Sequence, residues 1–99
     1  MSESESAFDN LDLAVGRAID EAMASLEADN IDHALDALER AVKVSESHPV
    51  FSKRASSEFH RIEGLARTCE RALVAGKRST AKVRALLSRI RGLKQSTIH

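Results

Sequence analysis

Apolar side chains recur at three- and four-residue spacing along most of this chain, which is the period of an amphipathic helix. The first run starts after Ser6, a predicted helix cap, and extends to about Ala28. A second run follows Asp29 and Asn30, either of which can cap a helix, and it stops before Pro49. Such a short connection predicts an antiparallel hairpin of two helices. The apolar positions of these two runs are Phe8, Leu11, Val15, Ala18, Ile19, Ala22, Leu26, Ile31, Leu35, Leu38 and Val42.

The third segment has the most regular pattern, a heptad seam in which spacings of four and three alternate. Pro49 is suited to the first position of its helix. The seam runs through Gly76, where the chain could end one helix and cap another at Ser79 or Thr80. Because the heptad register continues through Gly76, we predict a long third helix, continuous or kinked, that ends near Lys94. The seam positions are Ala55, Phe59, Ile62, Ala66, Cys69, Leu73, Gly76, Thr80, Val83, Leu87 and Ile90.

These helices predict an all-α fold with two possible architectures. A hairpin with a long third helix is a three-helix bundle, and that helix, about 69 Å long, would overhang a first helix of about 33 Å. Its uncovered apolar stripe would then bind a client helix or a second copy, giving a dimer. A turn at residues 76–79 would instead fold the stripe back and complete a four-helix bundle. The stripe comprises Val83, Leu86, Leu87, Ile90 and Leu93.

Organisation and location follow from the ends of the chain and from its single cysteine. We expect residues 1–6 to be a disordered acidic tail, residues 7–95 a single helical bundle domain and residues 96–99 a frayed C-terminus. The start is acidic and polar, unlike a signal peptide, and no apolar run is long enough to span a membrane. Cys69 has no partner for an internal disulfide, as in a reducing compartment. We therefore expect a cytoplasmic protein with no membrane partner.

Charge is sorted along the chain, although the formal net charge is zero. Residues 1–48 carry twelve acidic and three basic side chains, a balance of −9, and residues 49–99 carry the reverse, a balance of +9. No acid follows Glu70. Since electrostatic steering depends on where charge lies as well as on its total, the basic end is expected to meet an acidic surface.

Basic residues near the C-terminus form two rows along the predicted helix. Lys77, Arg84 and Arg91 lie in one heptad row, and Lys82 and Arg89 in another, so basic side chains flank the apolar stripe. This arrangement favours an acidic amphipathic helix as partner, from a client protein or a second copy. Nucleic acid is the alternative, because phosphates also bind arginine, although the −9 half would repel them.

Catalytic chemistry has no candidate in the sequence. The four histidines lack the paired spacing of metal ligands, and no cysteine joins them. Cys69 falls on the apolar seam, where a thiol without a base is inert. No pair of carboxylates lies in apolar surroundings, as general acid–base catalysis requires. We therefore predict a non-enzymatic protein with no cofactor and no metal.

Three stretches resemble the FlgN-type flagellar export chaperones, which are small helical proteins. They are Ala22 to Asn30, Leu65 to Leu73 and Val83 to Leu87, and the resemblance covers roughly residues 10–94. It implies a helical hairpin followed by a long helix, and a role in holding the C-terminal helices of client subunits before export. The stripe from Val83 to Leu93 would be the client groove.

Overall fold

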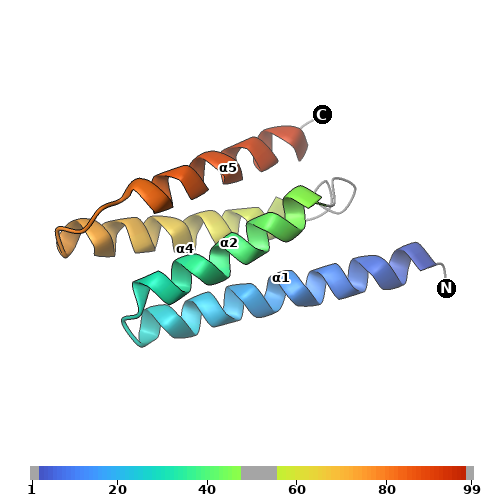
Figure 1. The fold of residues 1–99 in the computed structure, drawn as a ribbon. Helices are drawn as coiled ribbons and strands as arrows, with labels where there is room; N and C mark the ends of the chain where they lie inside the picture. The colour runs from blue at the N-terminus through green and yellow to red at the C-terminus, as the bar shows by residue number, and fades with distance from the viewer. Residues whose placement is uncertain (1–2, 48–55, 98–99) are drawn as a thin grey trace.

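The computed structural model describes residues 3–47 and 56–97, and these residues form helices joined by turns, with no strand (Figure 1). The helices are α1 (Glu3–Glu27), α2 (Ile31–Ser47), α4 (Ser56–Ala75) and α5 (Ala81–Thr97). The all-α prediction is therefore confirmed.

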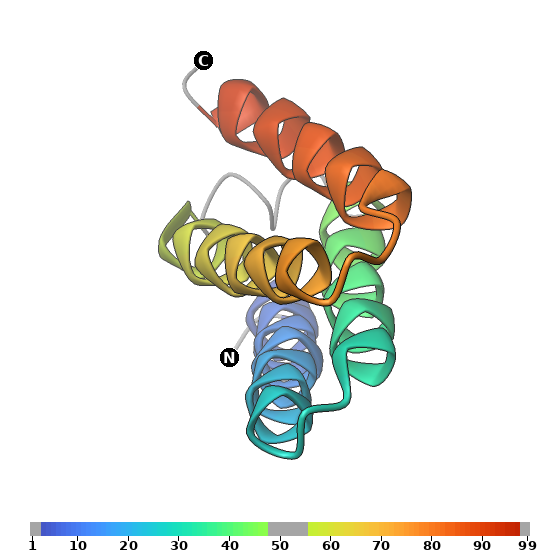
Figure 2. The same cartoon turned by 90° about the vertical axis from the view of Figure 1, so that its left-hand side faces the viewer.

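Helices α2 and α4 form the middle of the molecule. α1 packs against both of them from one side, and α5 packs against both from the other (Figure 2). α1 and α5 consequently lie at opposite edges of the bundle, which leaves each of them with a broad outer face.

The predicted long third helix is wrong. α4 ends at Ala75 and α5 begins at Ala81, so the chain turns back near Gly76, and the described residues form four helices in place of the predicted three-helix bundle. The alternative with a turn at residues 76–79 is the one that the structure has. Burial explains this outcome, because folding back covers an apolar stripe that the overhanging helix would leave in water.

The α4–α5 turn is a Schellman motif centred on Lys77. Lys77 has a φ of 55°, and its N–H donates to the Val74 carbonyl at 3.0 Å, while the Arg78 N–H donates to the Leu73 carbonyl at 2.8 Å. This pattern satisfies carbonyls that the end of a helix would otherwise leave without partners. Gly76 precedes the left-handed position and does not occupy it.

The α1–α2 turn repeats the same motif. Asp29 has a φ of 59°, its N–H donates to the Leu26 carbonyl at 3.0 Å, and the Asn30 N–H donates to the Ser25 carbonyl at 2.8 Å. Asn30 then caps α2, because its Oδ1 accepts a hydrogen bond from the His33 N–H at 3.2 Å. The predicted interruption and cap are both found here.

A single core joins all four helices. The predicted stripe residues of α5 complete it, and alanines from α1 and α2 allow these two helices to pack closely. The hydroxyls of Ser25 and Ser45, which are buried, donate to the carbonyls of Glu21 and Ala41 four residues earlier. The core residues with no or almost no exposed surface are Val15, Ile19, Ala22, Ala34, Ala37, Leu38, Ala41, Val42, Phe59, Ile62, Ala66, Cys69, Val83 and Ile90.

The start of the first helix differs from the prediction. α1 begins at Glu3, so residues 3–6 belong to a helix and Ser6 is not its cap. The predicted helix start at Pro49, the seam position Ala55 and the last two residues of the predicted frayed end lie outside the described residues.

Candidate functional site

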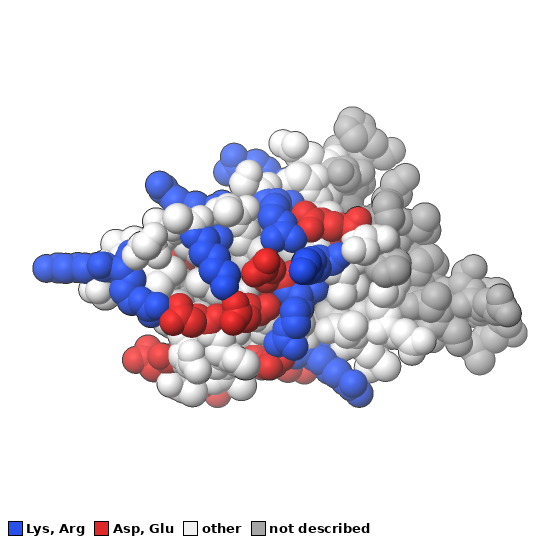
Figure 3. All heavy atoms as spheres, in the orientation of Figure 1, with Lys and Arg blue, Asp and Glu red and all other residues white. Residues whose placement is uncertain are grey.

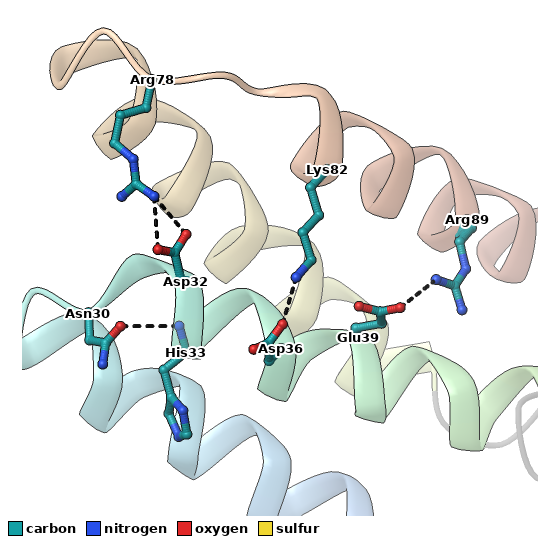
Figure 4. Close-up of polar contacts among 8 residues, drawn as sticks. All are labelled: Asn30, Asp32, His33, Asp36, Glu39, Arg78, Lys82 and Arg89. Carbon is teal, nitrogen blue, oxygen red and sulfur yellow. Dashed lines mark hydrogen bonds and ion pairs between the residues drawn. The ribbon is translucent and has the colours of Figure 1, made fainter.

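One of the two predicted basic rows faces α2 and is paired with its acids (Figure 4). Lys82 Nζ lies 2.6 Å from Asp36 Oδ1, and Arg89 Nη2 lies 2.6 Å from Glu46 Oε1. Arg89 Nη1 also lies 3.8 Å from a Glu39 carboxylate oxygen. These contacts neutralise the α2-facing row of α5 within the molecule.

Arg78 extends this series at the turn, where its Nη2 donates to both oxygens of Asp32, at 2.8 and 2.9 Å. The pairing is visible on the surface as red and blue side chains that meet where α5 lies over α2 (Figure 3). The hydrogen bond from Lys82 lowers the pKa of Asp36, and the hydrogen bond from Arg89 lowers the pKa of Glu46. Three basic side chains from the second half of the chain are thus paired with acids of α2.

The predicted partner-binding stripe lies in the core. Val83 and Ile90 have no exposed surface, and Leu86 and Leu93 are buried. Leu87 is half-buried at the edge of the core. A partner helix could therefore reach Val83 or Ile90 only after α5 had separated from α2 and α4.

The other predicted basic row faces solvent. Arg84 has 75% of its side-chain surface exposed, and its Nε lies 3.8 Å from Glu70 Oε2, beyond hydrogen-bonding distance. Arg91 and Lys77 are exposed, and neither makes an ion pair or side-chain hydrogen bond within the described parts of the chain. No close ion pair within the described residues neutralises this row.

Arg84 and Arg91 line a groove between α4 and α5, which we call the arginine groove. It consists of two adjoining hollows that share Glu70 and Arg84. The basic and apolar side chains that line the arginine groove include Arg67, Arg71, Val74, Arg84, Leu87 and Arg91. Arginines thus stand on both walls, and apolar side chains lie between them.

Two glutamates reduce the net positive charge of the arginine groove. Glu63 lies 4.0 Å from Arg67 and 3.2 Å from Lys94, and Glu70 lies near Arg84. Four arginines against these two acids leave the groove with an excess of positive charge. Because the Arg67 and Arg84 contacts are long and exposed, they bind these side chains weakly.

Sequence reasoning missed the α4 wall of this groove. Arg67 and Arg71 are four residues apart and so share a helix face, which is a signal that could have identified them. Val74 is apolar yet lies off the heptad seam, and it is 61% exposed in the structure. The predicted residues Arg84 and Arg91 form the opposite wall, on α5, whereas Lys82 and Arg89 face α2 instead.

Other chemistry has little support in the described residues. They contain no group of three or more His, Cys, Asp or Glu side chains placed to hold a metal ion. Cys69 is buried, and burial raises the pKa of its thiol, which disfavours the nucleophilic thiolate. No helix in the described ranges is long and apolar enough to cross a membrane.

No family model, no curated protein and no solved structure matches this chain.

Proposed function

We propose that this protein is a non-enzymatic protein-binding module, and that its arginine groove binds an acidic amphipathic helix of a partner. One observation carries the proposal. The α2-facing basic row is paired internally, while Arg84 and Arg91 remain exposed beside the apolar side chains of the groove. A groove with charged walls and an apolar floor fits a helix that presents acids beside leucines.

Protein is favoured over nucleic acid by the composition of the groove. Glu63 and Glu70 lie among its arginines and would repel a phosphate backbone, whereas a helix can place apolar or basic side chains opposite them. Leu87 and Val74 offer apolar contacts that phosphates cannot use. The acidic face of α2 further reduces the positive field around α5.

The proposed cellular role is that of a small cytoplasmic adaptor or chaperone that holds a client helix. The resemblance to FlgN-type export chaperones supports a client of this kind. The binding surface in our proposal is the arginine groove and not the stripe from Val83 to Leu93, because the stripe packs inside the bundle.

The test is direct binding of a designed probe. A fluorescein-labelled helical peptide of about 21 residues, with leucine and glutamate on one face, is titrated with the parent protein and followed by fluorescence anisotropy. A peptide with lysine in place of each glutamate is the control. We expect binding of the acidic peptide only, weakened more than about tenfold by Arg84→Glu/Arg91→Glu.

A labelled DNA duplex of about 20 base pairs is titrated under the same conditions. If the duplex binds with a steep salt dependence and the acidic peptide does not, the protein-binding proposal is wrong, and a nucleic-acid-associated regulator is the function that remains.

A further inference from the structure

The outer face of α1 carries a row of side chains that matches the arginine groove. Leu13, Asp20 and Glu27 are seven residues apart and so lie in one row along the helix. All three are exposed, and Leu13 is 57% exposed. Asp20 and Glu27 make no ion pair with any described residue. An acidic helix with an exposed leucine is the kind of partner that the groove is proposed to bind.

The spacing of the two rows agrees. Arg84 and Arg91 are also seven residues apart, so each pair of charges is separated by about 10.5 Å along its helix. If α1 lies parallel to α5 with Asp20 opposite Arg84, Glu27 falls opposite Arg91. Leu13, seven residues before Asp20, then lies about 10.5 Å further toward the α4–α5 turn.

One of the two hollows lies at that end of the groove. Its apolar residues, Val74 and Ala75, share the lining with Glu70, Arg71, Thr80 and Arg84, and Val74 is among the most exposed large apolar side chains described. In this register Leu13 falls opposite position 77, in the turn that follows the last turn of α4, where Val74 is exposed. The two charge pairs therefore set one alignment, and it places Leu13 at the end of the groove that holds Val74.

The two surfaces cannot meet within one molecule. α1 and α5 lie at opposite edges of the bundle, separated by α2 and α4 (Figures 1 and 2). A contact between α1 of one copy and the groove of another is heterologous, and it leaves a free groove and a free α1 at the two ends.

From this complementarity we infer that the arginine groove binds the outer face of α1 from a second copy of this chain, so that the protein associates head to tail. The inference rests on the proposed function, since it names the partner that occupies the proposed groove. Assembly by this contact extends beyond a dimer or closes into a ring.

Charge reversal on either surface tests the inference. Sedimentation velocity of the full chain at about 50 mM salt is expected to show association that increases with concentration and disappears at about 500 mM salt. Arg84→Glu/Arg91→Glu and Asp20→Lys/Glu27→Lys are each expected to weaken association by more than about 100-fold, because like charges then face each other. For a single reversal, Arg91→Glu alone is expected to weaken association, whereas Lys43→Glu, an equal charge change at an exposed position of α2, should leave association unchanged.

Mixing the two reversed variants provides the decisive measurement. In the mixture, acidic α1 of one variant meets the basic groove of the other, and basic α1 meets the acidic groove, so association is expected to return. In addition, Leu13→Cys and Val74→Cys in one chain should form intermolecular disulfides under mild oxidation, whereas Met23→Cys with Val74→Cys should not.

Any of three results would overturn the inference. The parent protein stays monomeric up to about 1 mM, the charge reversals do not change its association, or association does not return when the two reversed variants are mixed. The proposed function is judged separately. If the protein is a monomer but binds the acidic peptide in its groove, the proposed function stands. Only a second copy as the partner is then excluded.

Discussion

Arg89 holds Glu46 through two parallel hydrogen bonds, from Nε to Oε2 at 3.1 Å and from Nη2 to Oε1 at 2.6 Å. This fork joins the middle of α5 to the last turn of α2. Bidentate geometry makes it the best-formed of the contacts that attach α5 to the acidic hairpin.

A double-mutant cycle measures this link. With Arg89→Gln, Glu46→Gln and the double variant, urea unfolding is expected to give a coupling free energy of about 0.5–1 kcal/mol, the upper part of the range for exposed pairs. Lys82 and Asp36, which form a more exposed pair with one hydrogen bond, should give a smaller coupling. Zero coupling between Arg89 and Glu46 would mean that the fork does not attach α5.

Acid should weaken the contact between α5 and α2. Hydrogen bonds from Arg89 and Lys82 lower the pKa of Glu46 and Asp36 in the folded protein. A carboxyl whose folded pKa is lowered contributes stability above its ordinary value, here 4.5 for Glu46 and 3.8 for Asp36, and that contribution is lost as pH falls through the lowered folded value. The free energy of unfolding should therefore decrease below about pH 4.5.

Urea unfolding at a series of pH values, followed by circular dichroism, checks this expectation. Glu46→Gln/Asp36→Asn should be less stable than the parent at neutral pH and should lose less stability on acidification. An identical acid dependence in the parent and the variant would contradict the assignment.

Ile90→Ala should be strongly destabilising. Its side chain has no exposed surface in the core, and truncation of such a residue costs about 2–5 kcal/mol in transfer free energy and cavity formation. Leu87→Ala, at the edge of the core, should cost clearly less. Urea unfolding of both variants measures the difference. A cost below about 1 kcal/mol for Ile90→Ala would indicate that α5 is not packed on the bundle.

The left-handed residue of the α4–α5 turn can be identified by stability measurements. Lys77→Gly should raise the free energy of unfolding by about 0.5–1 kcal/mol, because glycine adopts a φ of 55° without strain, although it gains freedom in the unfolded chain. Gly76→Ala should be nearly neutral, since an added Cβ would meet the Ala72 carbonyl oxygen at 3.5 Å, an ordinary contact. Thermal denaturation of both variants is the measurement. A large loss from Gly76→Ala would place the left-handed position at Gly76 instead.

Periodicity predicted the helical hairpin and most of the core. The run from Ile31 to Val42 is buried where expected, and Asn30 caps its helix. The α4 seam positions from Phe59 to Leu73 are buried as well. These predictions succeed because the helical period and capping chemistry are local properties of the chain.

Periodicity could not locate the break between α4 and α5. The heptad register continues across Gly76, so the sequence pattern fits both a continuous helix and a turn. The residue that takes the left-handed conformation is Lys77, which carries no local signal for it, because its conformation is imposed by the return of α5 to the core.

By itself, the sequence determined an all-α protein, its helical faces and an acidic half followed by a basic half, since each depends on residue order alone. Only the tertiary structure decided how the charges are used. Folding α5 onto α2 pairs Lys82 and Arg89 with acids from the first half, and it leaves Arg84 and Arg91 beside α4 in solvent. That division depends on which neighbour each helix face meets, and burial of the stripe from Val83 to Leu93 selects those neighbours.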